Sequence, residues 1–357
     1  MPTGRMIQIV STDLGAGGMA RFVADFADAA RALGHRVVIS VGRGSGADHA
    51  ERLLDGRIEV GRLPAGRREA VRSVLAAVRS AGPDWVLLVT GAWPPSTRLG
   101  GAFGRVPVVE TPRVMPRRRR VKLGQRVSFT VRSTRRYRLV AINEEMAALS
   151  RSSCGAAGRA VRVVPNCIKL PRERREYQWG DVCRFVSFAR LDESHKDHET
   201  TLRALALLDR SLRRSWEMLF IGTGPDARSL EDLSRELGVG ARFVSGVDDL
   251  WSEVASHDVS VLSTKREGLP RVGVEAAAIG LATIGSDVPG VSDLFSGGAG
   301  GVLVSPGDAG AMASVMERMI RDAAWREAVA AGGPEVAARH EAMRAARVIC
   351  SVAEEML

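Results

Sequence analysis

The chain has 357 residues, of which 45% are hydrophobic and 26% are charged, and its formal net charge is +10. This length suits two domains better than one, and the hydrophobic fraction is sufficient for ordinary globular cores. No apolar run reaches the length of a membrane span, which excludes a transmembrane helix. The first residues pass straight into a predicted strand, so we expect no signal peptide.

The cysteines form no recognisable metal or disulfide motif. No two of them are spaced as C-x-x-C, so we expect reduced, unpaired thiols of a cytosolic protein. They are Cys154, Cys167, Cys183 and Cys350.

Positive charge is concentrated in the first half of the chain. Residues 1–170 hold 29 Lys and Arg against 12 Asp and Glu, a formal charge of +17, whereas the remainder carries −7. Between Thr111 and Asn143, eleven basic residues occur without one acidic residue. A basic run is usually a solvated face, but this one indicates an anionic partner: a membrane surface, a phosphorylated acceptor or nucleic acid. Its members are Arg113, Arg117, Arg118, Arg119, Arg120, Lys122, Arg126, Arg132, Arg135, Arg136 and Arg138.

The chain opens with a strand, a glycine-rich loop, a helix and a second strand. The strand is predicted over Met6–Val10 and the loop over Asp13–Met19, and the helix ends at Gly34 before a strand over Val37–Val41. Glycines in such a loop allow a phosphate to approach the backbone. The spacing G-x-G-x-x-G is not met, however, so the loop is only a weak indication of a phosphate site.

Strands and helices continue to alternate up to a polar stretch, residues 169–181, which we predict to be a linker. Asn143 is expected to cap a helix. The predicted elements of this part are a helix over Arg67–Ala81 and strands over Asp84–Val89, Val106–Val109, Leu139–Ile142 and Val161–Val164.

After the linker, a strand over Arg184–Ala189 leads into a loop that carries Arg190 and Lys196. Cations in a strand-to-helix loop suit phosphate binding, although loop cations ordinarily face solvent. His195 and His198 lie in the same loop, but their spacing matches no zinc motif.

The rest of the chain again alternates, and it ends in an alanine-rich helical tail from Ala323 to Leu357. Asp308 is expected to cap a helix, and Pro289–Gly290 is predicted to be a turn. The predicted strands are Met218–Gly222, Arg242–Gly246, Asp258–Ser263, Ala282–Ser286 and Gly301–Val304, and the predicted helices run from Pro270 to about Ile279, ending at Gly280, and from Ala309 to about Asp322.

Two carboxylates flank the start of the helix that follows the strand Asp258–Ser263. Glu267 lies in the loop ahead of the helix, and Glu275 lies within it. The helix start at Gly268, Leu269 and Pro270 favours an anion such as a phosphate, whereas a carboxylate accepts hydrogen bonds from hydroxyls. Phosphates and hydroxyls together suggest a nucleotide sugar. The alternative is a solvated Glu267 and a salt-bridged Glu275.

Several stretches together resemble the retaining glycosyltransferases of family GT4. EGLPRVGVEA resembles the E-x7-E signature of that family, and GLATIGSDVPGVSDL resembles its continuation, with Ala282 where proline is usual. RLDESHKDHETTLRALALL, GAGGMARFVADFADAARALGHRV and VVPNCI resemble other motifs of the family in the same order, with Cys167 and Lys169 replacing the usual Gly and Asp. The resemblance covers almost all of the second domain and is weaker over residues 40–165.

The resemblance implies an α/β protein of the GT-B fold, with two Rossmann-like domains facing a central cleft. The first would comprise residues 1–168 and bind the acceptor, the second would comprise residues 182–335 and bind a nucleotide sugar, and a helix within 336–357 would return to the first domain. The resemblance also assigns individual residues. Arg190 and Lys196 would hold the donor diphosphate, Glu267 the sugar hydroxyls and Glu275 the ribose, and Gly17, Gly18, Gly222, Gly224, Gly268, Leu269 and Pro270 would line the nucleotide sugar.

The reaction implied is sugar transfer from a UDP- or GDP-sugar to a glycan or a lipid-linked acceptor, with no metal and no cofactor. No D-x-D triplet occurs, which argues against a metal-dependent GT-A enzyme. Many relatives carry an acceptor-side histidine after the strand Val106–Val109. Here Arg113 is the nearest polar candidate. The protein would be cytoplasmic, and it would lie at the inner face of the plasma membrane if the basic segment binds lipid.

Three other interpretations fit part of the pattern. A UDP-sugar 2-epimerase has the same two-domain shape, but its chemistry would not need a basic acceptor side. A non-catalytic subunit would not need Arg190, Lys196, Glu267 and Glu275 together. A nucleic-acid binder would explain the basic run but not the two spaced glutamates, and the run contains only two aromatic residues, Phe129 and Tyr137.

Overall fold

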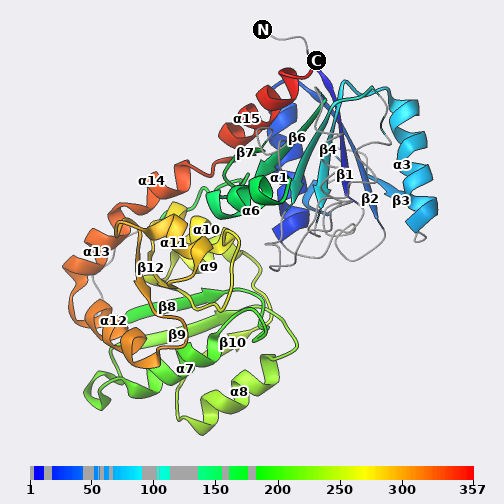
Figure 1. Ribbon diagram of the computed structural model, residues 1–357. Coiled ribbons are helices and arrows are strands. Elements are labelled where there is room, and N and C mark those ends of the chain that lie inside the picture. Colours follow the sequence, from blue (N-terminus) through cyan, green and yellow to red (C-terminus); the bar gives the residue numbers. More distant parts are fainter. Residues whose placement is uncertain are drawn as a thin grey trace. The chain divides into compact units, whose positions relative to one another are not determined.

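The computed structural model describes residues 4–11, 18–42, 52–54, 56, 60–63, 67–90, 103, 105–112, 136–154, 161–175 and 182–357. The chain divides into two compact units. One comprises Met1–Lys169 together with His340–Leu357, and the other comprises Leu170–Arg339. In each unit, helices pack against a central sheet (Figure 1). Of the predicted linker, residues 169–175 are described.

The sheet of the first unit is seven-stranded and parallel, in the order β3-β2-β1-β4-β5-β6-β7. Ile9 lies beside Ile39 on one neighbouring strand and Leu87 on the other, and all three are fully buried. Such strands are apolar throughout because helices cover both faces of a parallel sheet. The described elements are β1 (Met6–Ser11), α1 (Gly18–Ala32), β2 (Arg36–Gly42), β3 (Val60–Leu63), α3 (Arg67–Ala81), β4 (Trp85–Thr90), β5 (Val108–Pro112), β6 (Tyr137–Ala141), α6 (Glu144–Cys154) and β7 (Val161–Val163).

The last helix of the chain, α15 (Ala342–Glu354), belongs to the first unit. It packs beside α1 (Figure 1), and its buried face joins the core of the first sheet. The backbone fixes this return. The Ile168 N–H donates to the His340 carbonyl at 3.0 Å, and the Ala342 N–H donates to the Ile168 carbonyl at 2.9 Å. The C-terminal helix therefore crosses back to the first domain, as expected.

The sheet of the second unit is six-stranded and parallel, in the order β10-β9-β8-β11-β12-β13. This is the order 3-2-1-4-5-6 of the doubly wound fold, which reverses between β8 and β11. Ligands of such folds bind at that reversal, beyond the carboxyl ends of the strands. The elements are β8 (Cys183–Phe188), α7 (His198–Leu207), a 3₁₀ turn (Arg210–Leu212), β9 (Trp216–Ile221), α8 (Ala227–Glu236), β10 (Arg242–Val244), α9 (Leu250–Ala255), β11 (Val259–Leu262), α10 (Arg271–Ile279), β12 (Ala282–Ser286), α11 (Pro289–Phe295), β13 (Gly301–Val304), α12 (Ala309–Arg321), α13 (Ala323–Ala331) and α14 (Gly333–Ala338).

In both units, an aspartate just before the fourth strand in chain order accepts a hydrogen bond from a backbone N–H of the first strand. In the first unit, Asp84 precedes β4 and accepts a hydrogen bond from the backbone N–H of Met6 at 2.7 Å. In the second, Asp258 precedes β11 and accepts one from the backbone N–H of Arg184, also at 2.7 Å. Asp258 additionally forms a buried ion pair with Arg175, which lies within the predicted linker. A buried carboxylate needs such partners to offset the loss of hydration.

Most predicted elements are present with ends shifted by one or two residues, and the caps at Asn143 and Asp308 are confirmed. The turn predicted at Pro289–Gly290 is wrong, because these residues begin α11. Proline is tolerated in the first helical turn, where its missing N–H is not needed. Glycine is required at 290 by packing, since a Cβ there would lie 2.3 Å from the Gly268 carbonyl oxygen.

Candidate functional site

The predicted donor residues lie at the reversal of the second sheet. Arg190 and Lys196 follow β8, and Glu267 and Gly268 follow β11. These two strands are hydrogen-bonded neighbours, with Val259 beside Phe185. Since the carboxyl ends of parallel strands meet at one edge of a sheet, two loops that are 71 positions apart in sequence come together.

The two loops are joined through their backbones. Lys196 and Thr264 form an antiparallel bridge. The carbonyl of His195 accepts two hydrogen bonds at 2.9 Å, from the hydroxyl of Thr264 and from the backbone N–H of Lys265. The loop of Lys196 is therefore fixed to the loop of Glu267 independently of the Lys196 and Glu267 side chains.

Lys196 and Glu267 form an ion pair, with Nζ contacting Oε1. Their side chains are 16% and 17% exposed, so the pair is largely sheltered but still reachable from solvent. A cation and a carboxylate in contact offer a diphosphate and a sugar hydroxyl two complementary groups in one place.

Arg190 is oriented differently. Its side chain is 69% exposed, and its Nε atom lies 3.5 Å from the Oδ2 atom of Asp192. The backbone carbonyl oxygen of Arg190 contacts His198, whose Nε2 atom lies 3.1 Å from it. Burial lowers the pKa of His198 to about 4, so the ring is neutral near pH 7 and Nε2–H donates to this carbonyl. His198 is thus a support of the loop.

Glu275 lies inside α10 and is only 1% exposed. Its Oε1 atom lies 3.3 Å from the Nη2 atom of Arg271, one turn earlier in the helix. The salt-bridged alternative for Glu275 is therefore present in the structure. The N-cap of α10 is Pro270, whose side chain makes no capping hydrogen bond, and Leu269 is buried beside it. A helix start that lacks a side-chain cap favours an anion.

Glycines allow the backbones around the site to approach one another. A Cβ at Gly222 would lie 2.0 Å from the Ala189 carbonyl oxygen, and one at Gly224 would lie 1.9 Å from that of Leu191. Both carbonyls belong to the loop after β8. The Leu191 N–H also donates to the Thr223 carbonyl at 3.0 Å. Gly222 and Gly224 are therefore packing residues of the Arg190 loop in this structure.

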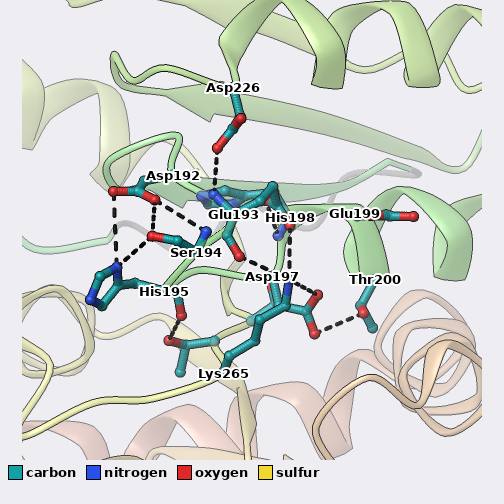
Figure 2. A network of polar contacts seen from close by, with 12 residues as sticks. Asp192, Glu193, Ser194, His195, Asp197, His198, Glu199, Thr200, Asp226 and Lys265 are labelled. Carbon is teal, nitrogen blue, oxygen red and sulfur yellow. Dashed lines mark hydrogen bonds and ion pairs between the residues drawn. The ribbon is translucent and has the colours of Figure 1, made fainter.

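The sequence does not indicate the network of charged residues around Glu193, Asp197 and Lys265 that Figure 2 shows. Lys265 points at Glu193 and Asp197, and Asp226 accepts a hydrogen bond from the backbone N–H of Glu193 at 2.8 Å. Glu193 and Asp197 lie within a stretch that resembles a family motif, and Lys265 and Asp226 lie beside such stretches, but none of the four carries a spacing signal of its own. Their roles emerge only when the two loops are brought together.

Several predicted residues lie outside the described part of the chain. Gly17, Arg113 and residues 113–135 of the basic segment lie outside the described residues, whereas Gly18 is the exposed first residue of α1. Two arginines of the basic segment are described. Arg136 donates to the Arg105 carbonyl at 2.6 Å, and Arg138 lies 4.0 Å from Glu355.

The described part of the chain contains no group of three or more His, Cys, Asp or Glu side chains arranged to hold a metal ion. Among the described helices, none is both long and apolar enough to cross a membrane.

Two doubly wound domains, a returning C-terminal helix and paired loops at the second switch point define the class of protein. Residues 16–172 match the model of Glycosyltransferase Family 4, and residues 183–322 match that of Glycosyl transferases group 1. The chain belongs to the glycosyltransferases of the GT-B fold.

Two of the similar proteins are bacterial glycosyltransferases with named roles or acceptors. The chain is 31% identical over 117 residues to the lipopolysaccharide core biosynthesis glycosyltransferase LpsD of Rhizobium meliloti, covering 32% of this chain and 34% of that protein. It is 29% identical over 139 residues to an α-1,4-N-acetyl-D-galactosaminyltransferase of Campylobacter jejuni, whose named acceptor is a GalNAc-containing undecaprenol diphosphate, covering 39% and 38%. The chain thus spans little more than a third of either relative.

The fold is shared more widely. The HepE protein of Anabaena, solved in complex with UDP and glucose, superposes with a TM-score of 0.75 at 16% identity, covering 98% of this chain and 99% of that one.

Proposed function

We propose that the chain is a retaining, metal-independent glycosyltransferase of the GT4 type that transfers a hexose-like sugar from a nucleoside diphosphate sugar to an acceptor hydroxyl. The observation that carries this proposal is the contact between Lys196 and Glu267 where the loops after β8 and β11 meet. It puts a cation suited to a diphosphate beside a carboxylate suited to sugar hydroxyls, at the switch point where doubly wound sheets bind ligands.

In the proposed reaction, the bond between the anomeric carbon and the diphosphate oxygen breaks, and its electron pair leaves with the diphosphate. The acceptor oxygen forms the new bond to the anomeric carbon on the same face. The leaving diphosphate takes the acceptor proton. Lys196 and Arg190 stabilise the negative charge that grows on the diphosphate, and Glu267 orients the sugar through its hydroxyls.

The nucleoside would lie beside α10 and the loop after β10. A hollow of about 550 Å³ opens at the loop after β10 and along α9, and it is lined by Gly246, Val247, Asp248, Asp249, Ser252, Glu253 and Ser256. In this proposal Glu275 accepts hydrogen bonds from the ribose hydroxyls. Because only 1% of Glu275 is exposed and Arg271 lies against it, the Arg271 side chain must move aside when the ribose binds.

We propose that the acceptor is a bacterial envelope glycan or a lipid-linked sugar, reached from the cytoplasm at an anionic membrane face. The charge of +17 on residues 1–170 supports this, since a nucleotide site needs only a few cations. Arg136 and Arg138 already contact other groups of the protein, so the cluster Arg117–Arg120 is the candidate for the lipid or the phosphorylated acceptor.

A screen of UDP-, GDP- and ADP-sugars by thermal shift tests the donor. A ligand at ~100 times its dissociation constant adds about 2.7 kcal/mol to stability. The donor that raises the melting temperature is then incubated with bacterial lipid-linked sugars, and the anomer of the product is read by NMR. A product of inverted configuration overturns the retaining mechanism, and epimerised or hydrolysed sugar without transfer favours a 2-epimerase. If none of the nucleotide sugars shifts the melting temperature, the proposed function is wrong.

A further inference from the structure

Lys265 lies two residues before Glu267, but its side chain turns away from that carboxylate. Its Nζ atom donates to the carbonyl of Glu193 at 2.8 Å. The same atom lies 3.7 Å from a carboxylate oxygen of Glu193 and 3.7 Å from one of Asp197 (Figure 2). Lys265 therefore reaches from the loop after β11 into the loop after β8. The two carboxylates that it faces there flank Lys196 in sequence.

The two carboxylates occupy the start of α7. Glu193 accepts a hydrogen bond from the backbone N–H of His198, the first residue of the helix, at 2.9 Å. Asp197 accepts one from the hydroxyl of Thr200 at 2.8 Å. In a doubly wound fold the helix after the first strand is a usual place for a ligand phosphate. Here protein carboxylates take that place.

These carboxylates are poorly hydrated. The side chain of Glu193 is 19% exposed and that of Asp197 is 7% exposed. Burial raises the pKa of Glu193, while the hydrogen bond from His198 and the Lys265 ammonium act in the opposite direction. Two sheltered negative charges next to Lys196 would repel an anionic ligand at the same edge of the sheet unless they are compensated.

Within the described part of this cluster, two cations each neutralise the negative charge of a single carboxylate. Lys196 lies against Glu267, and Arg190 lies against Asp192. Lys265 alone faces two carboxylates. Its loss would therefore leave more uncompensated negative charge than the loss of a cation that has a single partner.

We propose that Lys265 is a positioning residue for the donor diphosphate: it neutralises Glu193 and Asp197 and holds the Lys196 loop against the Glu267 loop. The diphosphate is then directed to the start of α10, away from the start of α7. This inference rests on the proposed function, because it concerns the donor of that same site.

Calorimetric titration with UDP, GDP and ADP tests the inference on the full chain, and the nucleotide that the parent binds most tightly is then used for every variant. Lys265→Met should weaken binding by at least about tenfold, the loss expected when a charge-assisted contact is removed. Lys265→Arg should bind within about threefold of the parent, because it retains the charge. Lys169→Met is the matched control, since Lys169 is an exposed lysine 3.8 Å from Asp28 in the other unit. It should leave the affinity unchanged.

Charge compensation is separated from simple packing by a second substitution. Glu193→Gln keeps an oxygen that can accept the hydrogen bond from His198 but removes the negative charge. The double variant with Lys265→Met and Glu193→Gln should regain most of the lost affinity. Lys265 is 45% exposed, and each variant is used only if its melting temperature lies near that of the parent. Should Lys265→Met melt early, Glu193→Gln alone decides, because it should bind the nucleotide at least as tightly as the parent.

The outcomes are distinct. If the parent binds none of the three nucleotides, the proposed function fails and this inference fails with it. If the parent binds but Lys265→Met binds equally well, only the inference is overturned. If Lys265→Met is weak and the double variant stays equally weak, charge compensation is wrong. If Glu193→Gln alone weakens binding, the carboxylate is required for donor binding and the inference is again overturned.

Discussion

The Nζ atom of Lys196 contacts the Oε1 atom of Glu267 across 71 positions of sequence. The contact exists because β8 and β11 are neighbours in the sheet, although β9 and β10 lie between them in the chain. It joins the two motifs that a nucleotide sugar would bridge, with the diphosphate on the lysine and the sugar on the glutamate.

Arg190→Ala and Lys196→Ala should lower turnover of the nucleotide sugar far more than they disturb folding. Both cations act on charge that grows in the transition state. Arg190 is 69% exposed, so its removal leaves no cavity. The measurement is kcat beside the melting temperature, with Arg203→Ala as the control because Arg203 is an exposed partner of Glu199. A variant with parental kcat and an unshifted melting temperature would remove that residue from the diphosphate site.

Glu275→Ala should affect both binding and stability. Loss of hydrogen bonds to the ribose should weaken nucleotide binding by roughly 1.5–3 kcal/mol. Because Glu275 and Arg271 form a sheltered ion pair, breaking that pair should also lower the free energy of unfolding by about 3 kcal/mol. The control is Glu335→Ala, whose pair with Arg339 has the same helical spacing but is exposed and should contribute little. Equal nucleotide affinity in the variant and the parent would exclude Glu275 from the ribose site.

Gly224→Ala should distort the loop that carries Arg190. The new Cβ would lie 1.9 Å from the Leu191 carbonyl oxygen, so the backbone must shift. Overpacking of this kind typically costs roughly 1–3 kcal/mol. Gly240→Ala is the matched control, because a Cβ there has no atom within 4 Å. Urea unfolding measures both, and an unchanged midpoint for Gly224→Ala would contradict the close approach of the two loops.

His198 should make the second unit less stable in mild acid. Its folded pKa of about 4 lies below the ordinary value of 6.5, so the unfolded chain binds the extra proton first. The free energy of unfolding should therefore fall as the pH falls from about 6.5 toward 4, by up to about 3 kcal/mol from this residue. His198→Gln should show a shallower decline, since glutamine does not titrate. Identical pH dependence in the two proteins would show that His198 is not buried as a neutral ring.

The basic segment should bind anionic membranes. Each Lys or Arg near an anionic leaflet contributes about 1 kcal/mol, so Arg117–Arg120 suffice for reversible attachment that salt weakens. In co-sedimentation, the parent should pellet with anionic vesicles at low salt and stay in solution with neutral ones. A variant with all four arginines changed to serine should remain soluble with both. If the parent ignores anionic vesicles, an acidic soluble acceptor replaces the membrane as the partner of this segment.

Much of the fold follows from the sequence because the parallel strands are continuous apolar runs separated by caps and glycines. The predicted limits of the strand Ala282–Ser286 and of the helix Arg67–Ala81 match the observed ones, since nothing competes with the local pattern there. The turn expected at Pro289–Gly290 fails because the same dipeptide also suits a helix start, and here it begins α11 with Gly290 packed closely against Gly268.

The site is less completely predictable. Glu267 and Lys196 can be found because they lie in recognisable motifs. Lys265 and Glu193 cannot, because their relation exists only after the loops of β8 and β11 are joined. The i, i+4 spacing of Arg271 and Glu275 does indicate a possible helical ion pair, but burial of that pair depends on the packing around α10.

Comparison of nucleotide and nucleotide-sugar affinities tests the Lys196–Glu267 site most directly. The dissociation constants of the nucleoside diphosphate and of its sugar are measured by calorimetry for the parent, Lys196→Ala and Glu267→Ala. Lys196→Ala should weaken both ligands, because both carry the diphosphate. Glu267→Ala should weaken only the nucleotide sugar, because only that ligand offers sugar hydroxyls. Unchanged affinities for both ligands in both variants would contradict the assignment of this loop junction as the donor site.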